Sequence, residues 1–446
     1  MALNLRSIWV LACSQPLSVW LTLGILFLEY VRPQAIYEPL AELPLSRFVI
    51  LSAVVVLFAE GKVFKARSPA NLPLAGYGIV VVASSLVAQD PTWAWANVSL
   101  FGQWLLIYLI VLNTIDSKER YFLFLTLFLL ASLKMAQHGA RSWASAGFQF
   151  RDWGATGAPG WFQNSGEFGI QMCVFLPLAV YFILSVRPYV RTWQFVALWA
   201  MPVLALVSIV ASSSRGAVVG AGCVAIWVAA RSKARFKVGL AVAVAAVLVF
   251  AIIPSESRER FSSAGDDRTS THRLDLWTAG LEMASRYPVL GVGYFGFEGF
   301  YRRHFRGDPG QTALPHNIFI QAVAELGYLG LLAFALLIAT TLSLNGKTRR
   351  LAKSLGTVDR AFLTNCALGL DGALIGFLGS GFFVTVLYYP YFWVNLAMAA
   401  CLHRCAVEAA SAATLPRQGR SKPHRVESRG ASKVHPGVWS AVARGG

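Results

Sequence analysis

The chain has 446 residues, of which 56% are hydrophobic and only 14% are charged, and it contains 14 tryptophans. Soluble domains usually have an apolar share a little under half, so this composition excludes a soluble domain. The formal net charge of +17 comes from basic residues dispersed among short loops and a tail, where a membrane protein needs them. Nucleic acid is therefore not expected as a partner.

Apolar runs recur along the chain, most of them near the length that crosses ~30 Å of hydrocarbon. Backbone groups inside a bilayer must be hydrogen-bonded within the segment, so each run predicts a helix. The sequence therefore predicts an all-α polytopic membrane protein with about twelve transmembrane helices. The predicted spans are about 8–31 (interrupted by Pro16), 45–60, 72–89, 97–115, 119–137, 168–186, 193–211, 216–230, 237–253, 317–343, 360–387 and 389–404.

Lysine and arginine concentrate in alternate short loops, which the positive-inside rule assigns to the cytoplasm. These residues are Lys62, Lys65, Arg67, Lys118, Arg120, Arg187, Arg191, Arg231, Lys233, Arg235, Lys237, Lys347, Arg349, Arg350 and Lys353. Both termini are then cytoplasmic. We expect nine spans in residues 1–253, a large outer loop at 254–316, three spans in 317–404 and a disordered basic tail at 405–446.

Two outward-facing segments precede the large loop. Residues 138–167 combine tryptophan and glycine, which suits a loop near a sugar or headgroup, although an aromatic belt without catalytic duty fits equally well. The tight turn Ser212–Gly216 contains Arg215, an arginine on the side where the positive-inside rule does not place one. It could simply reach the outer headgroups. Its small neighbours, including Ser214, favour close approach of a phosphate.

The outer loop at 254–316 is charge-balanced, with eight arginines and eight acidic residues. Thr269–Thr271 is predicted to cap a helix whose apolar face would include Leu274, Trp277, Leu281 and Ala284, and which would end at Tyr287–Pro288. Gly291–Gly296 lacks the pattern of a dinucleotide fingerprint and is interpreted as a flexible turn. Neither zinc-type spacing nor a D-x-D motif occurs, so no metal or other cofactor is expected.

His316 and Asn317 open the following apolar run, next to the loop. A lone histidine there could be an ordinary polar residue beside a capping asparagine. An imidazole at this rim could also accept a proton near neutral pH. Glu325, nine residues on, is expected to be paired and to support the site. The pairs Gly216/Gly220 and Gly372/Gly376 predict close helix contacts inside the bundle.

Three motifs in this order resemble the O-antigen ligase and polymerase family of bacterial envelope glycosyltransferases. They are Ser213–Gly216, the helix with Arg273 and Trp277 followed by Pro288, and His316-Asn317 leading to Glu325, Gly327 and Gly330. The segment Glu29–Gln34 is also similar to the branch called exosortase-associated O-glycosylation ligases.

The resemblance implies transfer of a glycan from an undecaprenyl-pyrophosphate carrier to an acceptor hydroxyl, at the periplasmic side of the bacterial inner membrane and without a metal. The acceptor can be a lipid, a protein or another glycan. By position, Arg215, Arg273 and His316 match the catalytic set. Ser214, Trp277, Arg286 and Asn317 are the candidate substrate-binding residues, and Arg268 or Arg286 could take the place of Arg273.

Two alternative functions remain at this stage. A polysaccharide polymerase would use the same donor and differ only in its acceptor. A transporter of lipid-linked glycans would also explain twelve spans, although transporters usually carry midplane charges in paired halves, whereas the polar residues here gather on the outer side.

Overall fold

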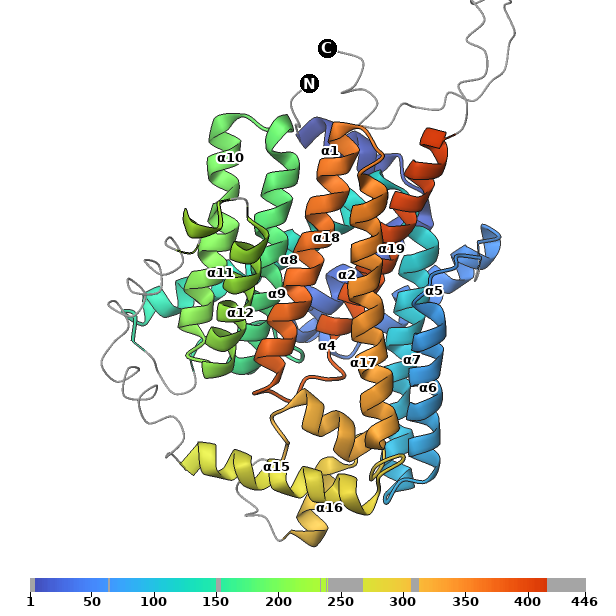
Figure 1. The fold of residues 1–446 in the computed structure, drawn as a ribbon, viewed down its shortest axis with the longest axis vertical. Coiled ribbons are helices and arrows are strands. Elements are labelled where there is room, and N and C mark those ends of the chain that lie inside the picture. The colour runs from blue at the N-terminus through green and yellow to red at the C-terminus, as the bar shows by residue number, and fades with distance from the viewer. Residues whose placement is uncertain are drawn as a thin grey trace, which may run out of the picture.

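The computed structural model describes residues 5–62, 65–149, 154–232, 234–237, 239, 268–305 and 313–414. These residues form helices joined by short loops, and the described part of the chain contains no strand (Figure 1). The all-α prediction is therefore confirmed. The helices are α1 (Leu5–Cys13), α2 (Leu17–Tyr30), α3 (Pro33–Ile36), α4 (Glu38–Ala41), α5 (Leu45–Ala59), α6 (Asn71–Leu86), α7 (Pro91–Thr114), α8 (Lys118–Ser145), α9 (Ser165–Val186), α10 (Thr192–Leu198), α11 (Ala200–Ala211), α12 (Arg215–Arg231), α15 (Arg268–Arg286), α16 (Phe297–His304), α17 (Ile318–Ala352), α18 (Thr357–Gly381) and α19 (Pro390–Thr414).

Six helical segments of the described residues are long and apolar enough to cross a membrane, or seven if one bent pair is a single span. The bent pair is the first predicted run, where Arg6–Cys13 meets Leu17–Ile36 at 114°. Pro16 lies in this break, and proline disrupts a helix by removing a donor and clashing with the preceding turn. Eleven of the twelve predicted runs contain helix, and the twelfth, 237–253, falls almost wholly outside the described residues. The total of twelve spans stays a prediction.

Helix α9 forms the centre of the bundle and packs against α8, α11, α12 and α18. Glycines allow the closest of these approaches. A Cβ added to Gly372 would lie 2.7 Å from Pro177 Cβ, and one added to Gly376 would lie 2.7 Å from the carbonyl oxygen of Cys173. A Cβ added to Gly220 would lie even closer to its neighbour, the Oγ of Ser380. The predicted role of the glycine pairs in helix contact is confirmed.

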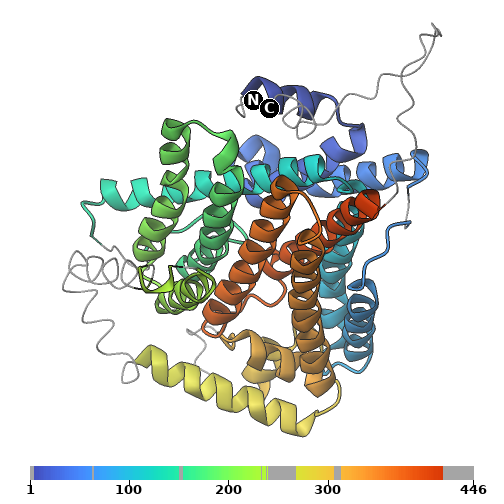
Figure 2. The same cartoon turned by 45° about the horizontal axis from the view of Figure 1, so that its top comes forward.

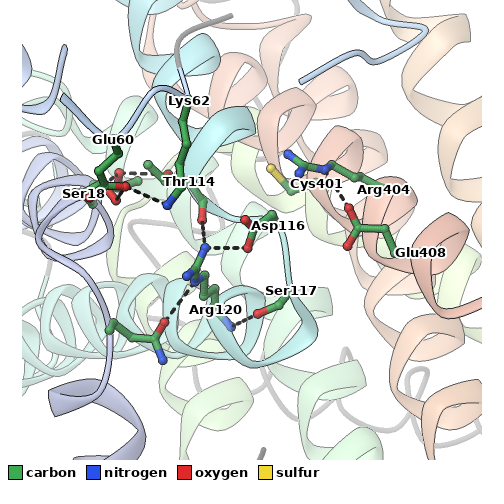
Figure 3. Close-up of polar contacts among 12 residues, drawn as sticks. Ser18, Glu60, Lys62, Thr114, Asp116, Ser117, Arg120, Cys401, Arg404 and Glu408 are labelled. Atoms are coloured by element: carbon green, nitrogen blue, oxygen red, sulfur yellow. Dashed lines mark hydrogen bonds and ion pairs between the residues drawn. The ribbon is translucent and has the colours of Figure 1, made fainter. Parts of the chain in front are cut away.

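The basic loops gather at one end of the bundle, together with the start of α1 and the end of α19 (Figure 1). Two arginines cap the last carbonyl groups of α7 there, and Figure 3 shows the contact of Arg120 with Thr114. Arg120 Nη1 donates to the carbonyl of Thr114 at 3.2 Å, and Arg404 Nη1 donates to that of Leu112 at 2.8 Å. A positive side chain at a helix C-terminus stabilises both the free carbonyls and the helix dipole.

Helix α17 is broken at Gly327, whose φ of 69° and ψ of −172° are open essentially only to glycine. The break exposes backbone groups that the segment Pro288–Gly296 satisfies. The N–H groups of Val292 and Gly293 donate to the carbonyls of Ala324 and Glu325, at 2.9 and 3.1 Å. In return, Tyr328 N–H donates to the carbonyl of Pro288 at 2.8 Å. The interpretation of Gly291–Gly296 as a flexible turn is therefore wrong, because this backbone is fixed against the break.

Helix α15 lies across the end of the bundle opposite the basic loops (Figure 2). It already runs from Arg268, so Thr269–Thr271 lie inside the helix and do not cap it as predicted. It ends at Arg286, as Pro288 indicated. In the predicted apolar face, Leu274 and Leu281 are exposed, so contact of this face with the membrane stays a prediction. The buried face is formed by Leu276, Ala279 and Met283 and packs on residues that include Phe297 and Ala324.

Three segment boundaries in the structure differ from those predicted from the sequence. Helix α8 continues to Ser145, so 138–145 is helix and not loop, while 150–153 lies outside the described residues. The predicted span 360–387 ends at Gly381, and residues 382–389 form a loop. Helix α19 continues to Thr414, so the predicted tail cannot begin at 405.

Candidate functional site

Residues Phe382–Tyr389, which we call the α18–α19 loop, contact the segments that carry His316 and Arg215. His316 precedes α17 and has a left-handed backbone with φ of 46°, a conformation that only a few per cent of non-glycine residues adopt and in which histidine is enriched. Its N–H donates to Thr385 Oγ1 of the loop at 2.8 Å. This hydrogen bond fixes the backbone that carries the imidazole.

Arg215 stands beside the same loop, at the first turn of α12. The neighbouring Gly216 packs so tightly that an added Cβ would lie 2.9 Å from Phe383 Cβ. An added Cβ on Gly166 would lie 3.2 Å from Val384 and 3.9 Å from Ser214 Oγ. The three-residue turn between α11 and α12 is the one that the sequence predicted, and it lies on the same rim as His316. The structure thus brings Arg215 and His316 to a shared loop.

Helix α15 adds Arg273 and Trp277, which are four residues apart and so lie on one face of the helix. Trp277 Nε1 donates to the carbonyl of Pro315 at 2.8 Å, and its ring lies 5.3 Å from that of Phe382. Trp277 therefore joins α15 to both the His316 segment and the α18–α19 loop. Arg273, one turn earlier, is close enough for its charge to act on the imidazole of His316.

The environment of His316 disfavours the charged imidazolium. Burial of the ring, and then the positive charge of Arg273 and that of His272, lower its pKa to about 4. Both causes act in one direction, because a buried site and a nearby cation each destabilise a second positive charge. At neutral pH the imidazole is uncharged, which is the form that can accept a proton.

Ser214 and Asn317 cap the two helices that begin at this rim. Ser214 Oγ accepts from the N–H of Ala217 at 3.3 Å. Asn317 Oδ1 accepts from the N–H groups of Phe319 and Ile320, at 2.8 and 3.1 Å, and the residue is only 2% exposed. These bonds satisfy backbone donors at each helix start. Each of the two side chains thus holds the first turn of a helix next to Arg215 or His316, and substrate contact by either stays a prediction.

Arg286 does not join the group. It lies nine residues beyond Trp277 on α15, about 14 Å along the helix axis at ~1.5 Å per residue. It is exposed, pairs with Glu282, and its guanidinium carbon lies 5.9 Å from the ring centre of Phe305. The prediction that Arg286 could occupy the space of Arg273 is wrong. The side chain of Arg268 lies outside the described side chains, so its place in the site stays a prediction.

Glu325 is 3% exposed and is paired, as expected. Its carboxylate accepts from Tyr388 Oη at 2.6 Å, from Gln321 Nε2 at 3.3 Å and from the N–H of Phe297 at 3.3 Å. The three donors belong to the α18–α19 loop, α17 and α16. Glu325 thus holds the loop against the broken helix, at a position facing away from solvent.

The sequence reasoning missed the α18–α19 loop because its residues are largely apolar and continue an apolar run. Two signals were present, namely Gly379 and Gly381 before the loop and Pro390 at the first turn of α19. Among the described residues, no group of three His, Cys, Asp or Glu side chains could hold a metal ion.

The fold and this rim define a multi-pass helical membrane protein with an arginine–histidine site at one end. Residues 200–335 match the family model described as O-antigen ligase. A stretch of 84 residues is 34% identical to the exopolysaccharide production protein ExoQ of Rhizobium meliloti (strain 1021), covering 17% of this chain and 19% of that protein. The chain thus matches about a fifth of that relative's length.

These matches confirm the resemblance to the O-antigen ligase family that the motifs indicated. The matched region contains Arg215, α15, α16 and the first half of α17, while the α18–α19 loop lies beyond it. The narrower branch of exosortase-associated O-glycosylation ligases stays a prediction.

Proposed function

We propose that this protein is an O-antigen ligase-like glycosyltransferase, which moves a glycan from an undecaprenyl-pyrophosphate carrier to an acceptor hydroxyl without a metal ion. The observation that carries the proposal is the meeting of Arg215, Arg273 and His316 around the α18–α19 loop. Trp277 holds α15 against this group, while Ser214 and Asn317 orient its members.

The arginines would act on the leaving group. The bond between the first sugar and the pyrophosphate breaks as the acceptor oxygen bonds to the same sugar carbon, and negative charge develops on the pyrophosphate. Guanidinium groups stay charged and offer paired donors, so they bind the transition state more tightly than the ground state. By analogy with oxyanion donors, one such group lowers the free-energy barrier by about 3–4 kcal/mol.

His316 would take the proton of the acceptor hydroxyl. Its uncharged state at neutral pH supports this role. A bound pyrophosphate opposes the charge of Arg273, so donor binding raises the pKa of His316 and makes the imidazole a stronger base in the complex. The site is thus set to accept a proton only when the donor is present.

We propose the bacterial inner membrane as the location, with both ends of the chain in the cytoplasm and the site on the periplasmic side. The separation between the basic loops at one end and α15 at the other supports this orientation (Figure 1). The proposed organisation is residues 1–253 as helical bundle, 254–316 as the loop carrying α15 and α16, and 317–414 as the closing helices, followed by a tail.

A polymerase is the second candidate, because the relative from Rhizobium meliloti is named for exopolysaccharide production. Its acceptor would be another growing glycan. The two functions share a donor and differ in product, so product mass separates them. A transporter is the third candidate, and it predicts that lipid-linked donor accumulates on the inner leaflet when the protein is inactivated.

The test is reconstitution of the purified chain in liposomes with lipid-linked oligosaccharide and separate lipid, protein and glycan acceptors. A new conjugate supports the ligase, and longer lipid-linked chains support the polymerase. His316→Gln and Arg215→Gln should abolish either product while donor remains on the outer leaflet. Arg286→Gln is the matched control, since Arg286 lies on the same end of the molecule but outside the site, and it should retain activity.

A further inference from the structure

Arg32 lies at the end of α2 in an unusual backbone conformation. Its φ of 53° and ψ of 52° are left-handed, and it precedes Pro33. Both features are unfavourable, since a side chain crowds the left-handed region and a following proline disfavours helical angles. A conformation of this kind persists only where surrounding contacts impose it, and such positions cluster at ligand-binding sites.

The contacts that hold Arg32 come from the segment before α9. Gly160, with φ of 91°, lies so close that an added Cβ would be 2.5 Å from Arg32 Cζ. The guanidinium also lies 5.3 Å from the ring centre of Trp161. Among the described residues, no carboxylate lies within ion-pair distance of Arg32 and its Nε has no hydrogen-bond partner. The guanidinium is thus held in place by packing and makes no direct ion pair, although the charge of Glu29 acts on it from a longer distance.

Glu29 is the carboxylate whose charge acts on Arg32, but its hydrogen bonds go to other side chains. Glu29 is 5% exposed and accepts from Trp161 Nε1 at 2.8 Å and from Gln103 Nε2 at 3.1 Å. Glu29 therefore fixes the indole ring and does not neutralise Arg32 by direct contact. A positive charge among membrane helices is expensive unless it meets an anion or a wet cavity.

Tyr389 completes the group and links it to the proposed catalytic rim. Its ring lies 5.0 Å from that of Trp161, roughly perpendicular to it. Tyr389 ends the α18–α19 loop, in which Thr385 binds the backbone of His316. Four residues span at most about 14 Å, so the two ends of the loop are within the reach of one short glycan.

We propose that Arg32, Trp161 and Tyr389 form a subsite for an acidic sugar of the glycan substrate, away from the sugar that reacts. This inference rests on the proposed function. The guanidinium would bind the carboxylate or phosphate of the sugar through paired hydrogen bonds. The aromatic rings would pack on the apolar face of the sugar, in the combination of apolar walls and few polar groups usual for ligand sites.

Binding of soluble trisaccharides to the full-length chain in detergent tests the subsite without turnover. The probes are an acidic trisaccharide of galacturonate and the neutral maltotriose, followed by saturation-transfer NMR. We expect at least tenfold tighter binding of the acidic probe, and loss of that preference in Arg32→Gln. Arg32→Lys should keep a weaker preference, because lysine retains the charge but not the planar fork.

Arg187→Gln is the matched control, since the guanidinium carbon of Arg187 also lies near an aromatic ring, 4.1 Å from the ring centre of Phe195, and Arg187 belongs to the connection between α9 and α10. The control should bind both probes as wild type does. Equal binding of the two probes by the wild type, or an unchanged preference in Arg32→Gln, overturns the proposal. A lowered melting temperature with the preference retained identifies Arg32 as a structural brace, which also overturns it. If Arg32→Gln does not fold, the comparison of Arg32→Lys with wild type decides.

Two further measurements separate other sources of the anion. Loss of a bound anionic lipid from Arg32→Gln in native mass spectrometry, with sugar binding unchanged, would assign the site to a phospholipid and overturn the proposal. In the liposome assay, a tenfold rise in the KM of the donor or of a glycan acceptor tells which substrate carries the sugar. A wild-type protein that binds the acidic probe yet transfers nothing would refute the proposed function alone.

Discussion

Replacing Arg273 by glutamine is expected to raise the pKa of His316, because the charge of Arg273 opposes protonation of the imidazole more strongly than that of His272. Burial of the ring is the larger cause and remains in the variant, so the pKa should move up from about 4 without reaching the ordinary value. The shift needs no substrate, and it therefore tests the geometry of the rim independently of the proposed reaction.

At mildly acidic pH, the lowered pKa changes the uncharged fraction of His316 by a large factor. With a pKa of about 4, roughly 90% of His316 is uncharged at about pH 5. An unperturbed histidine, with a pKa of about 6.5, would be only about 3% uncharged there, a difference of roughly thirtyfold. The variant should fall between these limits.

The assay is the rate at which diethyl pyrocarbonate modifies His316, followed on the isolated peptide by mass spectrometry between about pH 4 and pH 8. Only the uncharged imidazole reacts, so the rate follows the titration. His272→Gln should give a smaller shift, because His272 is the weakest of the three causes. Arg286→Gln, on the same helix but outside the site, should give none.

A wild-type midpoint near 6.5 would refute the burial of His316, and an unchanged midpoint in Arg273→Gln would refute its proximity to Arg273. If the protein is the proposed transferase, kcat/KM should show the same acid limb, since this ratio reports groups of the free enzyme. Activity should then persist well below pH 6.5 and decline only as the pH approaches about 4.

Four other outcomes are expected. Gly327→Ala should lower the melting temperature, because a side chain is strained by about 1–3 kcal/mol in this backbone conformation and the added methyl group collides with the Pro288–Gly296 segment. Gly222→Ala is the control, since Gly222 has open space around it, and it should leave the melting temperature unchanged. Asn317→Ala should cost about 1–2 kcal/mol of stability by circular dichroism melting, since two part-buried N–H groups lose their acceptor. Arg215→Lys should lower kcat/KM by about two orders of magnitude at constant melting temperature, and an undiminished rate would remove Arg215 from the proposed site. Finally, the pKa of His316 is lower in the folded state, so the unfolded chain binds the proton first as the pH falls. The free energy of unfolding should therefore decrease from about pH 6.5 down to about pH 4, and His316→Gln should flatten that dependence.

The sequence by itself determined the class of the protein and much of its local structure. Apolar runs set where helices form, because a bilayer leaves the backbone no other partner. The turn before Arg215 and the end of α15 before Pro288 also followed from local chemistry, since small residues permit tight turns and proline stops a helix. The ordered motifs that indicated the family are local as well.

Only the tertiary structure decided which of these residues meet. In a membrane, lipid-facing and core-facing side chains are both apolar, so periodicity does not tell which face of a helix packs inward. The sequence therefore could not tell that Leu276, Ala279 and Met283 form the packed face of α15, and it could not separate Arg273 from Arg286. The α18–α19 loop was hidden in an apolar run, although it joins Arg215 to His316. The pairing of Arg32 with Trp161, 129 positions apart in the chain, depends on packing between distant segments, which no local pattern encodes.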